Sequence, residues 1–123
     1  MTDLYILVPS PALCKRIPEG TFEDSIFVLD FQYVSATWKV KRREEVLPSN
    51  QTIPAPTFDE IMRALSCLQF YHNITCECSG DKFRAYCYER SYSEELHEAR
   101  AENAATAALK LWLEINNEVT NEA

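Results

Sequence analysis

The architecture follows from the stretch Ile74-Thr75-Cys76-Glu77-Cys78-Ser79-Gly80-Asp81-Lys82-Phe83-Arg84-Ala85-Tyr86-Cys87-Tyr88, which predicts a β-hairpin. Gly80-Asp81 is a two-residue turn, and strand side chains alternate between the two faces of a sheet. The predicted pairs are Ser79 with Lys82, Cys78 with Phe83, Glu77 with Arg84, Cys76 with Ala85, Thr75 with Tyr86, and Ile74 with Cys87. One face is therefore apolar, with Ile74, Cys76, Cys78, Phe83, Ala85 and Cys87. The other face carries Thr75, Glu77, Arg84, Tyr86 and Tyr88.

The polar face of this hairpin is the first candidate site. Glu77 opposite Arg84 forms a cross-strand ion pair, and Tyr86 and Tyr88 add an amphipathic aromatic surface of the kind enriched at binding sites. We therefore predict an interaction surface made of Glu77, Arg84, Tyr86 and Tyr88. The alternative is that another helix or strand covers these side chains.

The cysteines of the hairpin suggest a zinc site at first sight, together with His72. Structural zinc sites usually draw their ligands from tight C-x2-C knuckles, whereas Cys76, Cys78 and Cys87 lie at flat strand positions among apolar side chains. Free cysteine packs as a small hydrophobe. We predict buried thiols, with no metal and no cofactor. The odd total of five cysteines also favours reduced thiols.

The predicted fold class is α+β, with an antiparallel or mixed sheet of four to five strands and two main helices packed on it. A length of 123 residues suits one domain, 1–123, with a strand-rich half at 1–53 and a helix–hairpin–helix half at 54–118. In the first half we expect a strand at Leu4–Val8, a short helix after Ser10, one or two strands within Ser25–Arg42, and a loop at Glu44–Pro56.

Two capping boxes predict the main helices. Thr57 with Glu60 opens a helix whose core-facing residues are Phe58, Ile61, Met62, Leu65 and Leu68. Ser91 with Glu94 predicts a second helix from about Tyr92 to Asn117. Its core-facing stripe is Ala101, Ala104, Ala105, Ala108, Leu111, Trp112 and Ile115.

Charge and glycine content exclude several functions. The net charge of −7 disfavours nucleic acid and anionic membranes. The chain has only two glycines, which is too few for a P-loop or a dinucleotide-binding loop. The first residues lack a signal-peptide pattern and no apolar run is long enough to span a bilayer, so we expect a cytoplasmic protein without a membrane segment. No nucleophile–base arrangement is recognisable around His72 or His97, and we predict no enzymatic activity.

A basic cluster provides the alternative function. Lys39, Lys41, Arg42 and Arg43 surround Trp38 and Val40, and such a cluster can bind an anionic ligand. The competing interpretation is a charged strand end that blocks edge pairing, since Glu44 and Glu45 follow directly. Asp30 interrupts an apolar strand, and it needs a partner if that strand is central.

Two resemblances can be read from the second half. Pro54-Ala55-Pro56-Thr57-Phe58-Asp59-Glu60-Ile61 and the alanine-rich Glu102-Asn103-Ala104-Ala105-Thr106-Ala107-Ala108-Leu109 resemble segments of small uncharacterised proteins encoded by phages and prophages of gut anaerobic bacteria. The order helix, antiparallel strands, alanine-rich helix is similar to the double-stranded-RNA-binding domain, which grips phosphates with lysines at the start of its last helix. The matching segment here, Glu94–Arg100, is acidic, so this likeness concerns the order of elements and not the function.

We therefore expect a non-enzymatic accessory protein of phage or prophage type that acts through protein–protein contacts, including homo-oligomerisation. The alternative is a small-ligand or nucleotide-binding module that uses Lys39, Lys41, Arg42 and Arg43.

Overall fold

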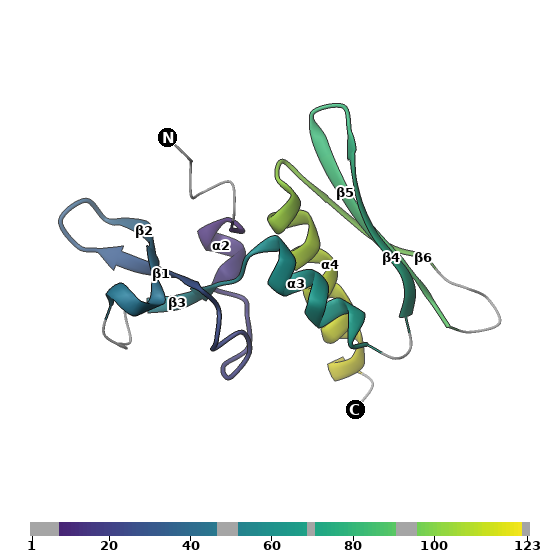
Figure 1. Ribbon diagram of the computed structural model, residues 1–123, viewed down its shortest axis with the longest axis horizontal. Coiled ribbons are helices and arrows are strands. Elements are labelled where there is room, and N and C mark those ends of the chain that lie inside the picture. The colour runs from purple at the N-terminus through teal and green to yellow at the C-terminus, as the bar shows by residue number, and fades with distance from the viewer. Residues whose placement is uncertain (1–7, 47–51, 69–70, 91–95, 122–123) are drawn as a thin grey trace.

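The computed structural model describes residues 8–46, 52–68, 71–90 and 96–121, and these residues form an α+β fold (Figure 1). The α+β prediction is confirmed. In chain order the elements are α2 (Pro11–Cys14), β1 (Phe27–Gln32), β2 (Thr37–Arg42), the 3-10 helix η1 (Arg43–Glu45), β3 (Thr52–Ala55), α3 (Phe58–Ser66), β4 (Tyr71–Ser79), β5 (Lys82–Glu89), β6 (Leu96–Ala101) and α4 (Ala104–Asn121). Of the predicted strand at Leu4–Val8, only Val8 lies within the described residues.

The strands form two separate antiparallel sheets, in the orders β2-β1-β3 and β4-β5-β6. The prediction of one sheet with four to five strands was therefore wrong. Figure 1 shows α3 and α4 between the two sheets. α4 has buried apolar side chains on several sides, so it can pack between the two sheets.

The first sheet includes a strand, β3, in a segment where the sequence predicts a loop. β3 pairs with β1 so that Ile53 lies opposite Leu29 and Pro54 opposite Val28. Proline has no N–H to donate, and it is tolerated in β3 because β3 is an edge strand. The segment Glu44–Pro56, predicted as a loop, therefore contains the end of η1 and the whole of β3. Residues 47–51 between them lie outside the described part.

The predicted hairpin register is confirmed from the turn back to the pair of Thr75 with Tyr86. The pairing of Ile74 with Cys87 was wrong, because the register shifts between His72 and Thr75 and brings His72 opposite Tyr88. Asn73, at the shift, has a φ of 54°, a left-handed conformation that asparagine adopts more readily than most residues. The β-bulge keeps both His72 and Thr75 on the outer face.

The start of the last helix differs from the prediction. Leu96–Ala101 forms β6, and α4 begins only at Ala104, where the Asn103 side chain accepts a hydrogen bond from the Thr106 amide at 2.7 Å. In β6 the side chains of His97 and Ala101 are buried and that of Ala99 is half-buried. The alternate side chains, of Leu96, Glu98 and Arg100, are exposed. This two-residue period suits a strand beside β5. The predicted capping box at Ser91 and Glu94 lies outside the described residues.

α4 is the central helix of the fold and not a helix with a single buried stripe. It contacts α2, α3 and all three strands of the second sheet. Leu109 and Leu113 are therefore buried together with the predicted Ala105, Ala108 and Leu111. The helix supplies core to both halves of the chain.

The capping box of α3 is confirmed. The Glu60 amide donates to Thr57 Oγ1 at 3.3 Å, and the Thr57 amide donates to Glu60 Oε1 at 2.8 Å. Glu60 Oε2 also accepts a hydrogen bond from the Ile26 amide at 3.3 Å, which ties the segment before β1 to this helix. Ile61 and Leu65 are buried as predicted.

Candidate functional site

The second sheet has one covered face and one open face. The inward side chains of Ala85 and Cys87 are buried in the core cluster that includes α4. Figure 1 shows both α3 and α4 on this side of the sheet, and no described helix or strand lies on the other side. The predicted surface of Glu77, Arg84, Tyr86 and Tyr88 belongs to this open face.

Arg84 organises the charged half of the open face. Its guanidinium group donates to Glu98 at 2.6 Å and to Glu77 at 3.3 Å, so the predicted cross-strand ion pair is present. The guanidinium carbon also lies 4.2 Å from the ring centroid of Tyr86. The hydrogen bond from Arg84 holds the pKa of the Glu98 carboxyl below its ordinary value. Arg84 is thereby held in one orientation over the tyrosine ring.

The aromatic half of the open face is a row across three strands. His72 on β4 and Leu96 on β6 both lie opposite Tyr88 on β5. The ring centroids of His72 and Tyr88 are 6.2 Å apart, and those of Tyr86 and Tyr88 are also 6.2 Å apart. Leu96 is 40% exposed. The open face therefore contains His72, Glu98 and Leu96 in addition to the four predicted residues. Glu98 and Leu96 lie on this face because of the pairing of β6 with β5.

The thiols divide between the core and the surface. Cys87 is buried as predicted, Cys76 is half-buried, and Cys78 is exposed, so the prediction that Cys78 is buried was wrong. Figure 1 shows the β4–β5 turn projecting beyond the helices, which explains why an inward side chain near the turn stays uncovered. Burial raises the pKa of Cys87 to about 11 and that of Cys14 to about 12. Within the described ranges, no three His, Cys, Asp or Glu side chains are arranged to hold a metal ion.

The predicted basic cluster is distributed over several structural contacts. Lys41 pairs with Asp30 at 2.9 Å, which supplies the partner that Asp30 needs on the central strand β1. Arg43 Nε donates to the Ser25 carbonyl oxygen at 2.7 Å, and its Nη2 donates to the Ser25 hydroxyl at 3.0 Å. Lys39 is exposed. Two of the four cations are therefore engaged in holding the first sheet and the segment before it.

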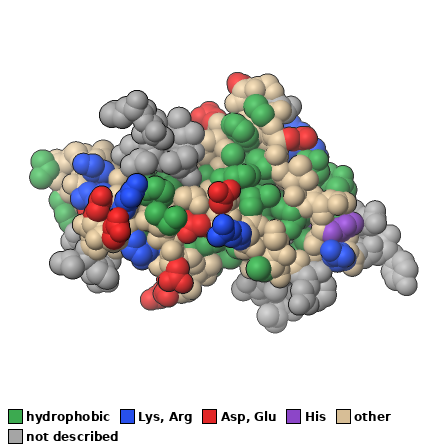
Figure 2. Space-filling model, viewed as in Figure 1, with side chains coloured by type: hydrophobic (Ala, Val, Ile, Leu, Met, Phe, Trp, Pro, Cys, Tyr) green, Lys and Arg blue, Asp and Glu red, His purple; other side chains and the backbone are tan. Residues whose placement is uncertain are grey.

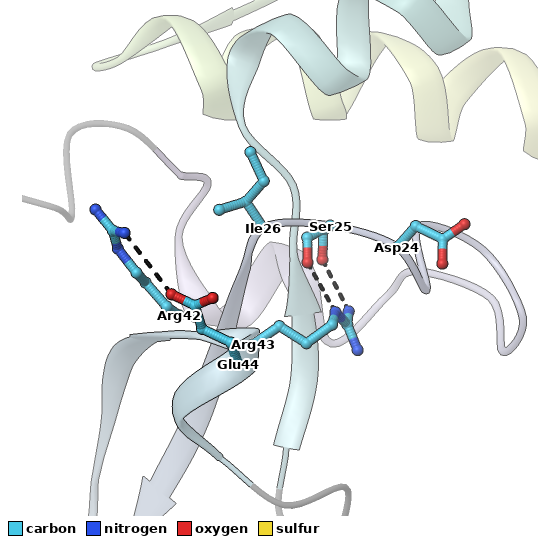
Figure 3. Close-up of a pocket in the computed structure, with 6 residues that line it drawn as sticks. All are labelled: Asp24, Ser25, Ile26, Arg42, Arg43 and Glu44. Carbon is cyan, nitrogen blue, oxygen red and sulfur yellow. Dashed lines mark hydrogen bonds and ion pairs between the residues drawn. The ribbon is translucent and has the colours of Figure 1, made fainter.

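Arg42 and Arg43 line a cavity of about 450 Å³, shown in Figure 3, together with Asp24, Ser25, Ile26 and Glu44. Arg42 lies 3.9 Å from Glu44. The two cations are matched by two carboxylates, and Figure 2 likewise shows acidic and basic side chains intermixed over the first sheet. Lys39 and Lys41 are not among the lining residues. The cavity therefore has little excess of positive charge.

A second set of cations surrounds a cavity of about 380 Å³ at the start of α4. Lys82 from β5, Arg100 from β6 and Lys110 from α4 line it, and among the described residues Glu102 is the only carboxylate in the lining. The members of this cluster lie far apart in the chain, and no local spacing in the sequence connects them. The acidic segment Glu94–Arg100, which was compared with the lysine-bearing helix start of the double-stranded-RNA-binding domain, does not begin α4. Its described residues belong to β6.

No helix among the described residues is long and apolar enough to cross a membrane. The fold and its open aromatic face define the class of the protein, a small α+β protein with an exposed sheet surface. In comparisons with known proteins, no family model, no curated protein and no solved structure matches the chain.

Proposed function

We propose that this chain is a non-enzymatic accessory protein that works through protein–protein contacts made by the open face of its second sheet. The supporting observation is the position of Tyr86 and Tyr88 on a sheet face that no described element covers. The phage or prophage type of the protein is supported by the sequence resemblance alone.

The chemistry of the face suits a protein partner. Tyrosine rings contribute a large contact area at a small cost in side-chain entropy, and their hydroxyl groups remain available for hydrogen bonds. Arg84 is already held by Glu77 and Glu98, so little ordering entropy remains to be lost when a partner binds. The partner would offer apolar side chains to the row of His72, Tyr88 and Leu96, and hydrogen-bond acceptors to the tyrosine hydroxyls.

A site-specific crosslinker tests this proposal. A photoreactive phenylalanine analogue replaces Tyr88 in the protein in its host cell, and we expect crosslinking to one discrete protein. Tyr33 is the control, because it is an exposed tyrosine, at 67%, in the turn between β1 and β2. Excess unlabelled protein should compete with the crosslinking. The Tyr86→Ala, Tyr88→Ala variant should compete at least about tenfold less well, because truncation of an aromatic hot-spot residue weakens binding by about 2 kcal/mol or more. Equal crosslinking from positions 88 and 33, or equal competition by the variant, would contradict the proposal.

A second candidate function is binding of a small phosphate-bearing ligand, as a nucleotide-binding module would do. The observation that favours it is the convergence of Lys82, Arg100 and Lys110 on one cavity. In an acidic protein, three cations facing a single carboxylate form a local anion-binding environment. The predicted set of Lys39, Lys41, Arg42 and Arg43 offers less, because three of its members have internal partners.

A thermal-shift screen tests this second function with inorganic phosphate, pyrophosphate, nucleotides and short oligonucleotides. Binding at one hundred times the dissociation constant stabilises a fold by about 2.7 kcal/mol, which corresponds to several degrees for a domain of this size. We expect the shift to disappear in Lys82→Ala and to persist in Lys39→Ala. An unchanged melting temperature with every ligand would rule out the candidate.

A further inference from the structure

The outer edge of β6 has main-chain groups that point away from the sheet. Gly80-Asp81 closes a two-residue hairpin, so Ser79 and Lys82 form a hydrogen-bonded pair and such pairs then alternate along the strands. Arg84 and Tyr86 consequently direct their N–H and C=O groups toward β4. Their partners on β6, Arg100 and Glu98, must direct theirs away from β5. Among the described residues no strand lies on that side.

The hydrogen bond accepted by the Arg100 carbonyl oxygen is consistent with this outward direction. The donor is Lys110 Nζ at 3.1 Å, a contact from outside the sheet. Lys110 is exposed, and a lysine over an open strand edge is a usual way of shielding that edge in a monomer. The flexible lysine can leave this oxygen when a strand supplies a main-chain donor instead.

The side chains of β6 are complementary to a second copy of themselves. When two β6 strands lie antiparallel with Ala99 opposite Ala99, each Glu98 faces Arg100 of the second copy. The two-fold axis thus creates two ion pairs at once. Glu98 and Arg100 are also the residues whose main-chain groups face outward, so the same register makes them hydrogen-bonded pairs. Charge and main-chain direction therefore select one register.

Within the described part of the monomer, Arg100 interacts with the charge of Glu98 on its own strand, but at a distance longer than that of an ion pair. Arg100 lies directly opposite Arg84, and like charges in that position destabilise a strand pair. Arg84 turns to Glu77 and Glu98, whereas Arg100 forms no ion pair with a described residue. Glu98 of a second copy would add a carboxylate directly opposite Arg100 across the new strand pair.

We propose that two copies of this chain join through the open edges of β6, antiparallel about Ala99, into one continuous sheet of six strands. The occupant of the edge is the chain itself. The open faces of the two second sheets become one surface with a row of His72, Tyr88 and Leu96 at each end. The main-chain bonds of this dimer lie along the edge of the sheet and leave Tyr86 and Tyr88 on the face uncovered, whereas Glu98 belongs to both the edge and the face.

Charge reversal tests the dimer by sedimentation velocity at about 1 to 100 µM protein. The wild-type chain should sediment as a dimer at the higher concentrations and dissociate more readily as salt is added. Glu98→Arg or Arg100→Glu alone should weaken dimerisation at least about tenfold, because each replaces two attractive pairs with two repulsive ones. An equimolar mixture of the two variants should form a heterodimer, because opposite charges then meet at both positions.

Two controls separate this result from misfolding and from the proposed function. Far-UV circular dichroism and the melting temperature show whether each variant is folded, and heterodimer formation is itself a property that misfolded chains would lack. The Tyr86→Ala, Tyr88→Ala variant should remain dimeric. A wild-type chain that stays monomeric at 100 µM, or a variant mixture that stays monomeric, would overturn the proposal.

Discussion

Replacement of Leu109 by alanine is expected to lower the free energy of unfolding by about 2–5 kcal/mol. Leu109 has 0% exposure and lies in the helix that contributes core to both halves of the chain. Its loss removes buried apolar area and leaves a cavity that the surrounding side chains fill only in part. Because natural domains are stable by about 5–15 kcal/mol, the variant would approach the limit of stability. Urea denaturation followed by the fluorescence of the buried Trp112 measures the change.

Leu96→Ala is the matched control, since it makes the same chemical change on the open sheet face. Leu96 is 40% exposed, and we expect its replacement to cost less than about 1 kcal/mol. Similar losses for the two variants would contradict the central position of α4. A reduced denaturant slope for Leu109→Ala would show a change of compactness as well as of stability.

The five thiols are expected to react with iodoacetamide at rates that differ by about a thousandfold or more in the native protein. Cys67 and Cys78 are exposed and should react first. Cys14 should be among the slowest, because burial raises the pKa of its thiol from the ordinary 9.0 to about 12, and three units reduce the reactive thiolate at neutral pH about a thousandfold. Cys87, with a pKa of about 11, should also be slow, and burial raises the pKa of Cys76 as well. Peptide mass spectrometry after timed alkylation gives the rate at each position.

Alkylation in urea is the reference for these rates. The unfolded chain should react at all five positions within a narrow range of rates, so that native protection is the ratio of the two measurements. At pH 9 Cys14 and Cys87 should still react slowly, because the pKa values of their thiols, about 12 and about 11, lie above that pH. Rapid native reaction at Cys14 or Cys87 would show that these thiols are not buried as the structure places them.

Local patterns were sufficient where neighbouring residues determine the geometry. The Gly80-Asp81 turn fixes the strand register for several residues on either side, and the capping box of Thr57 and Glu60 starts a helix wherever the rest of the chain lies. The ion pair of Glu77 with Arg84 follows from the same register. These features depend on contacts within about a dozen residues.

Local patterns failed where a distant partner decided between two structures. Leu96–Ala101 suits either the beginning of an alanine-rich helix or a strand, and the free edge of β5 selects the strand. Pro54 suggested a loop, but an edge position beside β1 accepts a residue without an N–H. Glu98 and Leu96 joined the candidate site only through β6, and the cavity cations Lys82, Arg100 and Lys110 come from three elements.

The sequence by itself determined the hairpin, its two chemically different faces and the helix that starts at Thr57. Each of these results from alternation, turn geometry or capping, which act over short stretches of chain. Only the tertiary structure decided that the strands divide into two sheets around α4 and that Cys78 lies beyond the covered part of its face. The physical reason is that burial depends on which surfaces meet in space, whereas the alternation of a strand shows only which side chains point the same way.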